Sequence, residues 1–247
     1  MFLLFLFSTA FLVLTVATTY AYFSGSCYRN KLFPCDDKFC LYKEFPLALP
    51  HRVEDDVHRL LLNKDIQKRV SIRMSPETVM RCALPNKDGV TISTPDMDSH
   101  SEHVIPFYQH QLRTIVSRLT GLDLQPTDLH LPTSCALLIY EKENDWINWH
   151  YDHNYYQGRF FTVLIPITRN LTCTRFQFRD TSGQIQSLDL THNSLLFEGN
   201  YLYHRATKLC KDQRRVMLSC QYVTDNSMSA LHRARLRIKD FAYTGRL

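Results

Sequence analysis

The sequence predicts an α+β fold that is mainly β, with a jelly-roll core, helices packed on one of its faces and a transmembrane helix at the N-terminus. Three observations lead to this prediction. An uncharged apolar stretch opens the chain, amphipathic helical patterns follow it, and strand-like runs recur from about residue 134 onward at intervals of roughly 8–12 residues. Helices followed by a run of strands are typical of a β core covered by helices. With 247 residues, of which 45% are hydrophobic and 21% charged, the chain is long enough for one such domain and a small appendage.

The N-terminal stretch is predicted to be an uncleaved single-pass anchor over 1–23. From Phe2 to Phe23 there is no charged side chain, and about 22 residues in a helix span about 33 Å, enough for a bilayer core. A cleaved signal peptide is the alternative, although the charged region that usually opens one is missing. Residues 24–50, which contain three prolines, are predicted to be a juxtamembrane connector.

Two sets of signals disagree about the side of the membrane that the remainder faces. Basic residues follow the span and none precedes it, which places the bulk of the chain in the cytosol by the positive-inside rule. A glycosylation sequon at 170–172 and an even count of 8 cysteines favour the lumenal side, with Cys27, Cys35 and Cys40 as the expected disulfide partners. The prediction is a protein of the endoplasmic reticulum or another endomembrane, with a preference for the lumen. No CxxC pair exists, so the sequence does not support a structural zinc site of the usual spacing.

Two helices are predicted ahead of the strands. Apolar positions with charges between them indicate a helix from about 53 to 70. A better-defined helix covers 104–119, with Pro106 in its first turn and Gly121 at its C-terminal cap. Residues 84–100, rich in Pro, Asp and Ser, are predicted to be a loop.

Seven strands and a tail complete the predicted domain. The strands are expected at 134–140, 146–152, 160–167, 175–178, 185–190, 194–197 and 216–223. They place the domain over 51–225 and leave 226–247 as a basic C-terminal tail. Its basic residues are more typical of a solvated helix face or a membrane-facing surface than of a nucleic-acid patch, so no nucleic-acid partner is expected.

Glycine is scarce, and its spacing excludes two large classes of nucleotide-binding enzyme. The sequence contains 7 glycines, and no two of them lie closer than 16 residues. The dinucleotide fingerprint and the P-loop each need several glycines within about eight positions, because backbone N–H groups must approach a phosphate. Neither motif is present.

The segment 149–152 carries the first chemical signal. Side chains at i and i+2 of a strand point to the same face, so His150 and Asp152 are expected to project together into the core of the barrel. His204 follows shortly after the strand predicted at 194–197. Two histidines and one carboxylate form the facial triad of non-heme Fe(II) oxygenases, which leaves coordination positions open. An isolated HxD pair is weak evidence, since structural histidines also produce it.

An arginine at the start of the last strand strengthens this interpretation. Arg215 lies eleven residues after His204, and the planar guanidinium fork matches a carboxylate with two hydrogen bonds. It is therefore a candidate anchor for the distal carboxylate of 2-oxoglutarate. A surface arginine at a strand end is the alternative for Arg215, and Arg214 is its competitor.

These motifs, taken in order, resemble the catalytic core of the Fe(II)/2-oxoglutarate-dependent oxygenase superfamily, most closely its prolyl 4-hydroxylase-like branch. The similarity covers about 112–223 and lies in RLTGL at 118–122, LLIY at 137–140, HYD at 150–152, NSLLFEG at 193–199 and HRA at 204–206. The fold that it implies is a double-stranded β-helix, which is a jelly-roll or cupin-like core. Where this superfamily branch has a glycine-rich turn, the chain has EKEND at 141–145, and substrate choice is expected to diverge there.

The resemblance implies a role for each matching residue. His150, Asp152 and His204 would be the catalytic iron ligands, Arg215 would form a salt bridge with 2-oxoglutarate, and Tyr140 would contact the same cosubstrate. Arg215 is preferred to Arg214 because its phase with Ser219 and Tyr222 matches the strand of the superfamily. The implied cofactors are Fe(II), 2-oxoglutarate as cosubstrate and O2, with ascorbate as an optional addition.

The function expected from the resemblance is hydroxylation of a peptidyl, prolyl-like substrate with release of succinate and CO2. Trp149, Tyr155 and Tyr156 flank the expected iron site and are candidate substrate contacts, with a place in the core as the alternative. His153 is expected on the opposite face of its strand from Asp152. A hydroxylase of a small molecule or lipid and a non-catalytic metal-binding module are the competing functions. The sequence leaves the oligomeric state open.

Overall fold

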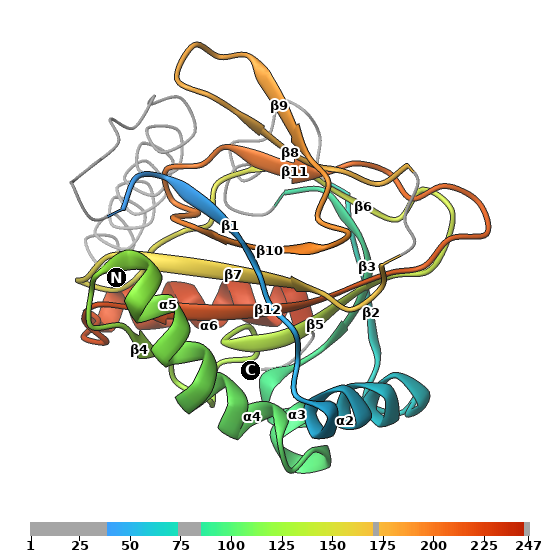
Figure 1. Cartoon of the computed structure of the whole chain (residues 1–247), viewed down its shortest axis with the longest axis horizontal. Helices are drawn as coiled ribbons and strands as arrows, with labels where there is room; N and C mark the ends of the chain where they lie inside the picture. Colours follow the sequence, from blue (N-terminus) through green and yellow to red (C-terminus); the bar gives the residue numbers. More distant parts are fainter. Residues whose placement is uncertain (1–38, 74–84, 170–172, 245–247) are drawn as a thin grey trace, which may run out of the picture.

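The structure is a computed structural model that describes residues 39–73, 85–169 and 173–244 (Figure 1). The anchor predicted over 1–23, most of the connector and the sequon at 170–172 lie outside these residues. Within the described part of the chain, no helix is both long enough and apolar enough to cross a bilayer.

The core is one curled antiparallel sheet of 12 strands that forms a half-barrel (Figure 1). Its order is β1-β10-β7-β12-β5-β3-β6-β11-β8-β9, with β2 paired to β3 and β4 paired to β12. This mainly β architecture is consistent with the predicted jelly-roll core. In chain order the strands are β1 (Tyr42–Pro46), β2 (Lys68–Ile72), β3 (Lys87–Ile92), β4 (Gln125–Pro126), β5 (Cys135–Tyr140), β6 (Trp146–His150), β7 (Phe160–Pro166), β8 (Phe176–Arg179), β9 (Ile185–Leu188), β10 (Asn193–Phe197), β11 (His204–Ala206) and β12 (Arg215–Val223).

Alternation along the central strands separates two environments. In β12, Val216, Leu218 and their alternate neighbours belong to the large core that includes the helices, whereas Arg215 and Ser219 line the interior of the half-barrel. The side chains of β5 and β7 alternate between these two environments in the same way, because successive residues of a pleated strand point to opposite faces. The polar residues of these strands therefore gather on the concave side.

The helices cover the other face of the sheet (Figure 1). Apolar residues of α2 (His51–Leu62), α3 (Thr94–His100), α4 (Val104–Pro106), the π-helical turn η2 (Phe107–Leu112) and α5 (Arg113–Thr120) pack with the sheet into one large core. The long helix predicted over 104–119 is thus present, with the π turn in its middle. Gly121, at φ 67°, ends α5 as predicted, because glycine adopts the left-handed conformation without steric cost.

Two predicted elements between residues 53 and 100 are wrong in part. The helix predicted to reach residue 70 ends at Leu62, because Asn63 is extended and the chain turns back into β2. The loop predicted over 84–100 contains β3 and α3. Ser93 caps α3, its hydroxyl accepting from the N–H of Asp96, and a proline occupies the first turn.

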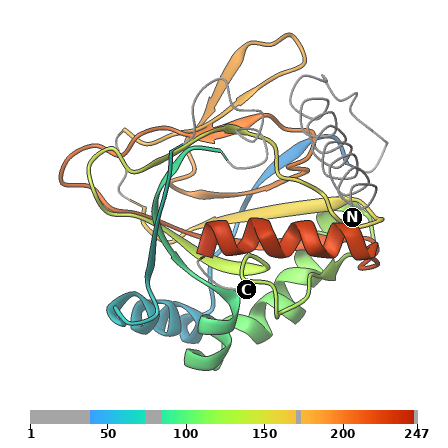
Figure 2. The same cartoon turned by 180° about the vertical axis from the view of Figure 1, so that it is seen from behind.

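Both predicted appendages of the domain contain regular structure. Residues 42–46, assigned to the connector, form β1 and pair with β10 at the edge of the sheet. The predicted basic tail contains helix α6 (Ala230–Thr244), which lies along the sheet in Figure 2. Leu236 and Asp240 of this helix are buried, and Thr133 donates to the Asp240 carboxylate. The helix is therefore docked on the domain.

Cysteine pairing differs in part from the expectation. Cys173 and Cys210 form a disulfide that closes over β8 to β11. Cys40 is disulfide-bonded, as a member of the expected cluster, but Cys27 and Cys35 lie outside the described residues, so pairing within that cluster stays a prediction. Cys135 and Cys220 are free, buried and opposite each other on β5 and β12.

Candidate metal centre

Two histidines face each other across neighbouring strands. His150 is the last residue of β6, and His204 is the first residue of β11 and pairs directly with it. Their ring centroids lie 4.2 Å apart, and both side chains are buried. Strand pairing alone therefore brings together two residues that are far apart in the sequence.

Backbone carbonyls set the orientation and the tautomer of both rings. The Nδ1 of His150 lies 2.7 Å from the carbonyl oxygen of Asn148, and the Nδ1 of His204 lies 2.8 Å from that of Leu202. A carbonyl only accepts, so each Nδ1 carries the proton and each Nε2 keeps its lone pair. This second hydrogen bond is the usual arrangement for histidines that bind a metal through Nε2.

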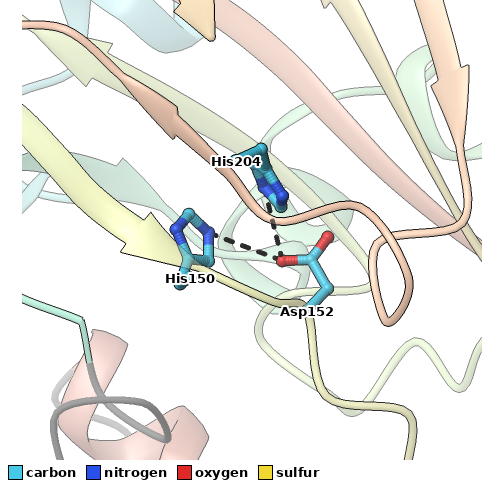
Figure 3. A group of neighbouring side chains, drawn as sticks. All are labelled: His150, Asp152 and His204. Atoms are coloured by element: carbon cyan, nitrogen blue, oxygen red, sulfur yellow. Dashed lines mark ion pairs between the residues drawn. The ribbon is translucent and has the colours of Figure 1, made fainter. Parts of the chain in front are cut away.

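Asp152 completes the group of three (Figure 3). Its Oδ1 lies 3.6 Å from the Nε2 of His150 and 3.9 Å from that of His204. Strand β6 ends at His150, so Asp152 is held by its own contacts rather than by strand alternation. Its backbone N–H donates to the carbonyl of Gly199 at 2.9 Å, and its Oδ2 accepts from the hydroxyl of Thr162 at 2.8 Å.

The electrostatics of the three residues favour a neutral imidazole beside a charged carboxylate. Burial and the neighbouring His204 hold the pKa of His150 well below its ordinary value. Burial opposes ionisation of Asp152, but the imidazoles of His204 and His150 and the hydrogen bond from Thr162 outweigh it and lower the pKa. At neutral pH the site therefore offers the nitrogen lone pair of His150 and an anionic oxygen of Asp152.

Aromatic rings enclose His204 on two sides. The ring of Phe176 stacks on it at 5.2 Å, and the ring of Phe197 meets it edge-on at 5.0 Å. Both phenylalanines belong to the apolar cluster on the concave side of the sheet. This packing restricts the rotamer of His204 and keeps water away from one side of the site.

A cavity of about 130 Å³ opens beside the triad and contains the predicted cosubstrate residues. Arg215 and Tyr140 pair across β12 and β5, and the guanidinium carbon of Arg215 lies 5.3 Å from the centre of the Tyr140 ring. Both side chains are buried, and burial raises the pKa of Tyr140 to about 12, so its hydroxyl stays protonated. The cavity wall therefore presents a cation and a hydroxyl donor.

The structure separates the two competing arginines. Arg215 is 5% exposed and lines the cavity, whereas Arg214 is exposed to solvent. Ser219 shares the inner face with Arg215, as predicted. Tyr222 does not, because it lies an odd number of residues away, and its hydroxyl donates to the carbonyl of Tyr108 among the helices.

The three aromatic candidates for substrate contact do not line the cavity. Tyr156 is buried and stacks on Phe160 in a separate apolar cluster, and Tyr155 is buried beside α6. Trp149 points away from His150 and stacks on Tyr203 outside the half-barrel. His153 was expected on the opposite face from Asp152, but it lines the cavity because the strand has already ended.

Several residues that support the site were not identified from the sequence. Glu198 is 1% exposed and receives two hydrogen bonds from Arg159, at 2.9 and 2.8 Å. The neighbouring Gly199 touches Asp152, and the carbonyl of Glu198 accepts from the N–H of Leu202. In the sequence, the only indication of these supporting contacts is that Glu198 and Gly199 are adjacent and lie shortly before His204.

Lys87 and Lys239 are two further cations in the cavity wall. Lys87 is buried on β3 and donates to the hydroxyl of Thr91 at 3.3 Å, and burial lowers the pKa of Lys87 to about 8. Lys239 extends from α6 and lies 5.4 Å from the centre of the Tyr155 ring. Neither position belongs to a motif, so sequence reasoning had no signal for them.

The donor set fits a divalent transition metal. One ligand atom from each of His150, Asp152 and His204 lies within 4.8 Å of the others, and two imidazoles with one carboxylate suit non-heme iron. The cavity next to them offers Arg215 for a carboxylate, which fits a dicarboxylate cosubstrate. The residues present therefore fit Fe(II) and 2-oxoglutarate.

Comparisons with known proteins agree with this geometry at the level of the fold. No family model and no curated protein matches the sequence. Among solved structures, a Pseudomonas putida prolyl-4-hydroxylase is similar with a TM-score of 0.51 and 11% identity, over 75% of this chain and 93% of that chain. A Trichoplax adhaerens prolyl hydroxylase in complex with a hypoxia inducible factor peptide fragment gives 0.51 and 13%, over 78% and 86%.

A third similar structure acts in a different chemical setting. SnoN, described as a non-heme alpha ketoglutarate dependent epimerase from nogalamycin biosynthesis, gives a TM-score of 0.54 at 12% identity, over 84% of this chain and 81% of that chain. The chain thus has the fold of the Fe(II)/2-oxoglutarate oxygenases, and a His-Asp-His triad lies in it. The predicted resemblance is confirmed at this level.

Proposed function

We propose that this protein is an Fe(II)- and 2-oxoglutarate-dependent dioxygenase that hydroxylates a peptidyl, prolyl-like substrate. The observation that carries the proposal is the triad of His150, Asp152 and His204, in which both imidazoles present Nε2 to the same carboxylate oxygen. When bound, iron and 2-oxoglutarate would react with O2: 2-oxoglutarate is oxidatively decarboxylated to succinate and CO2, and one oxygen atom is placed on a substrate carbon.

The residues of the triad would hold the metal and leave one side of it open. The carbonyls of Asn148 and Leu202 fix the two rings, so neither imidazole needs to reorient when a metal binds. Thr162 occupies the second oxygen of Asp152, which leaves Oδ1 for the metal. The cavity that adjoins the three side chains would leave room for the cosubstrate and O2.

Arg215 and Tyr140 would orient the cosubstrate. The buried guanidinium binds a carboxylate more strongly than it would in water, because the surroundings have a low dielectric constant. The protonated hydroxyl of Tyr140 adds a donor on the same wall. Leu138 and Leu164 also line the cavity and would shield the apolar middle of the cosubstrate from water.

The fold supports a peptide as the substrate class, because the chain shares it with a prolyl hydroxylase that is described as being in complex with a peptide fragment. The same fold in an epimerase from nogalamycin biosynthesis keeps a small molecule as the second candidate.

Succinate production tests the proposal. Purified protein is incubated with Fe(II), 2-oxoglutarate and ascorbate, and succinate is measured without substrate, with proline-rich peptides, and with lipids or small molecules. We expect slow uncoupled succinate formation that a proline-containing peptide accelerates, with a gain of 16 mass units on the peptide. Acceleration by lipids alone would replace the peptide with the second candidate. An absence of any succinate would contradict the enzymatic function.

The disulfide supports an oxidising compartment as part of this proposal. Cys173–Cys210 closes a loop over β8 to β11, and disulfides of this kind persist in secretory compartments and not in the cytosol. The proposed location is the lumenal side of an endomembrane. Protease protection of the domain in sealed microsomes is the expected result, and digestion without detergent would contradict it.

A further inference from the structure

A patch of aromatic rings and guanidinium groups lies outside the half-barrel. We call it the outer patch, and its members are Trp149, Tyr151, Arg179, Tyr203 and Arg205. Trp149 and Tyr203 stack with centroids 5.4 Å apart, and Tyr151 lies 4.9 Å from Tyr203. The guanidinium carbons of Arg205 and Arg179 lie 4.7 and 5.2 Å from the centre of the Trp149 ring. Two like charges are therefore held beside one indole.

The positive charge of the outer patch is not neutralised by the described part of the chain. Arg205 donates to the amide oxygen of Gln177 and Arg179 to the carbonyl of Gly183, and no described carboxylate lies within ion-pair distance of either. Other arginines of the domain do pair with carboxylates. The pairs are Arg59 with Asp56, Arg69 with Asp145, Arg73 with Asp88, Arg113 with Asp123, Arg159 with Glu198 and Arg175 with Asp189.

The outer patch is continuous with the mouth of the cavity. Arg205 and Tyr151 belong both to the patch and to the cavity wall. Arg205 also follows His204 directly in the chain, so the patch begins one residue from the triad. A ligand that enters the cavity and extends out of it on this side must pass over the patch.

The wall of the cavity keeps a net positive charge when the proposed metal and cosubstrate are counted. The two charges of Fe(II) and the one of Arg215 balance Asp152 and the two carboxylates of 2-oxoglutarate. Asp152 is the one carboxylate among the described residues of the wall, which also holds Lys87, Arg205 and Lys239. Asp240, 3.9 Å from Lys239, offsets part of this excess from behind the wall. The surplus charge favours a substrate that is itself anionic.

We propose that the outer patch binds an acidic segment of the polypeptide substrate, next to the residue that enters the cavity. This inference rests on the proposed function, since it names the class of peptide. Carboxylates of the segment would accept paired hydrogen bonds from Arg205 and Arg179. The rings of Trp149 and Tyr203 offer an apolar surface to the aliphatic parts of the same side chains.

Trp149 itself supplies a probe of binding. The chain has 2 tryptophans, so Trp146→Phe leaves Trp149 as the single indole. The full-length Trp146→Phe protein, without Fe(II) and without 2-oxoglutarate, is titrated with octaglutamate, octalysine and a neutral Gly-Ser octapeptide while its fluorescence is recorded. We expect octaglutamate alone to change the emission, with an affinity that falls as salt is added. Calorimetry of the wild-type protein gives the same comparison if Trp146→Phe does not fold.

Charge variants test the two arginines individually. Arg205→Gln and Arg179→Gln are each expected to weaken octaglutamate binding roughly fivefold. The matched control is Lys208→Gln, which removes one charge from an exposed residue beside Trp146, 5.9 Å from its ring. It is expected to leave the affinity unchanged.

Three results would overturn the inference. They are equal binding of the neutral peptide, an equal loss in Lys208→Gln, and a preference of the patch for a DNA oligonucleotide over octaglutamate. Because the titration needs neither metal nor turnover, failure here leaves the proposed oxygenase activity intact. Loss of succinate formation with octaglutamate binding retained would instead contradict the proposed function.

Discussion

Asp152 and Gly199 are in contact so close that residue 199 has no room for a side chain. The Asp152 N–H donates to the Gly199 carbonyl at 2.9 Å, and a Cβ built on Gly199 would lie 2.2 Å from Asp152 Oδ2 and 2.4 Å from its Cβ. Strand β6 ends two residues before Asp152, so this contact and the hydrogen bond from Thr162 position the carboxylate. The glycine is therefore part of the metal site although it offers no ligand atom.

Gly199→Ala is expected to displace Asp152 and to weaken metal binding. Loss of a group that positions a ligand typically costs about 10–100-fold in metal affinity. The measurement is a titration with Co(II) or Fe(II) under anaerobic conditions. Gly183→Ala is the control, because Gly183 has open space around it but a φ of 81°. It should lower stability by about 1 kcal/mol and leave metal affinity unchanged. Equal affinities of Gly199→Ala and wild type would show that Asp152 is not held in this way.

Arg215→Met is expected to weaken 2-oxoglutarate binding, and Arg214→Met is not. The first removes a buried guanidinium from the cavity, whereas the second removes an exposed charge one residue away. A charge-assisted pair of hydrogen bonds contributes about 1.5–3 kcal/mol, so the dissociation constant should rise by roughly 10–100-fold. Calorimetric titration of the metal-loaded protein with 2-oxoglutarate measures it. A larger loss in Arg214→Met would reverse the assignment.

The buried pair of Arg159 and Glu198 is expected to contribute strongly to stability. Glu198→Gln removes the negative charge that faces the guanidinium of Arg159, whose side chain is 22% exposed. Removing one partner of a buried ion pair costs about 3–5 kcal/mol. Urea unfolding measures the loss, and Arg159→Met combined with Glu198→Gln should recover part of it. Additive losses in the double variant would mean that the two side chains are not coupled.

The lowered pKa of Asp145 leads to a prediction of how the stability of the fold depends on pH. Burial alone would raise the pKa of Asp145, but hydrogen bonds from Arg69 and from the N–H groups of Lys142 and Glu141 outweigh it and lower the pKa. The unfolded state then binds more protons than the folded state in acid. Asp145 stabilises the folded state fully at pH values above about 3.9, its pKa in the unfolded chain. This stabilisation is lost as the pH falls through the lower pKa that Asp145 has in the folded state.

The free energy of unfolding should therefore decline as the pH falls below about 4. Asp145→Asn is expected to be less stable at pH 7 and to show a shallower decline, as measured by urea unfolding between pH 7 and 3. Asp98→Asn, at an exposed position of α3, is the control and should keep the wild-type profile. An unchanged profile in Asp145→Asn would contradict the depressed pKa.

The parts of the fold that follow a clear period were predictable from the sequence. Alternating strands such as β7 and β12 were expected within a residue or two of their bounds, and so was the helix that ends at Gly121. The triad was predictable because HxD keeps its ligands two residues apart and a histidine follows the strand β10. Its fit to a metal depends on contacts with Gly199 and Thr162 that no spacing in the sequence reveals.

Strand β3 shows why other parts were missed. Its inner face carries Lys87, Gly89 and Thr91, which are polar or small because they border the cavity and the ring of Tyr140. A strand with such residues on one face has the composition of a loop. The turn at 141–145 was expected to influence substrate choice, but it does not line the cavity. There Asn144 adopts φ 68°, and Asp145 accepts from two backbone N–H groups.

Metal binding by the full-length protein tests the central claim most directly. Under anaerobic conditions we expect one Fe(II) or Co(II) ion per wild-type chain. His150→Ala is expected to lose at least about 10-fold in affinity, because the loss of a group that only supports a ligand already costs that much. His130→Ala, at an exposed histidine outside the triad, should match the wild type. A wild-type chain that takes up no ion, or a His150→Ala variant that binds it as tightly, would contradict the assignment of His150, Asp152 and His204 as a metal centre.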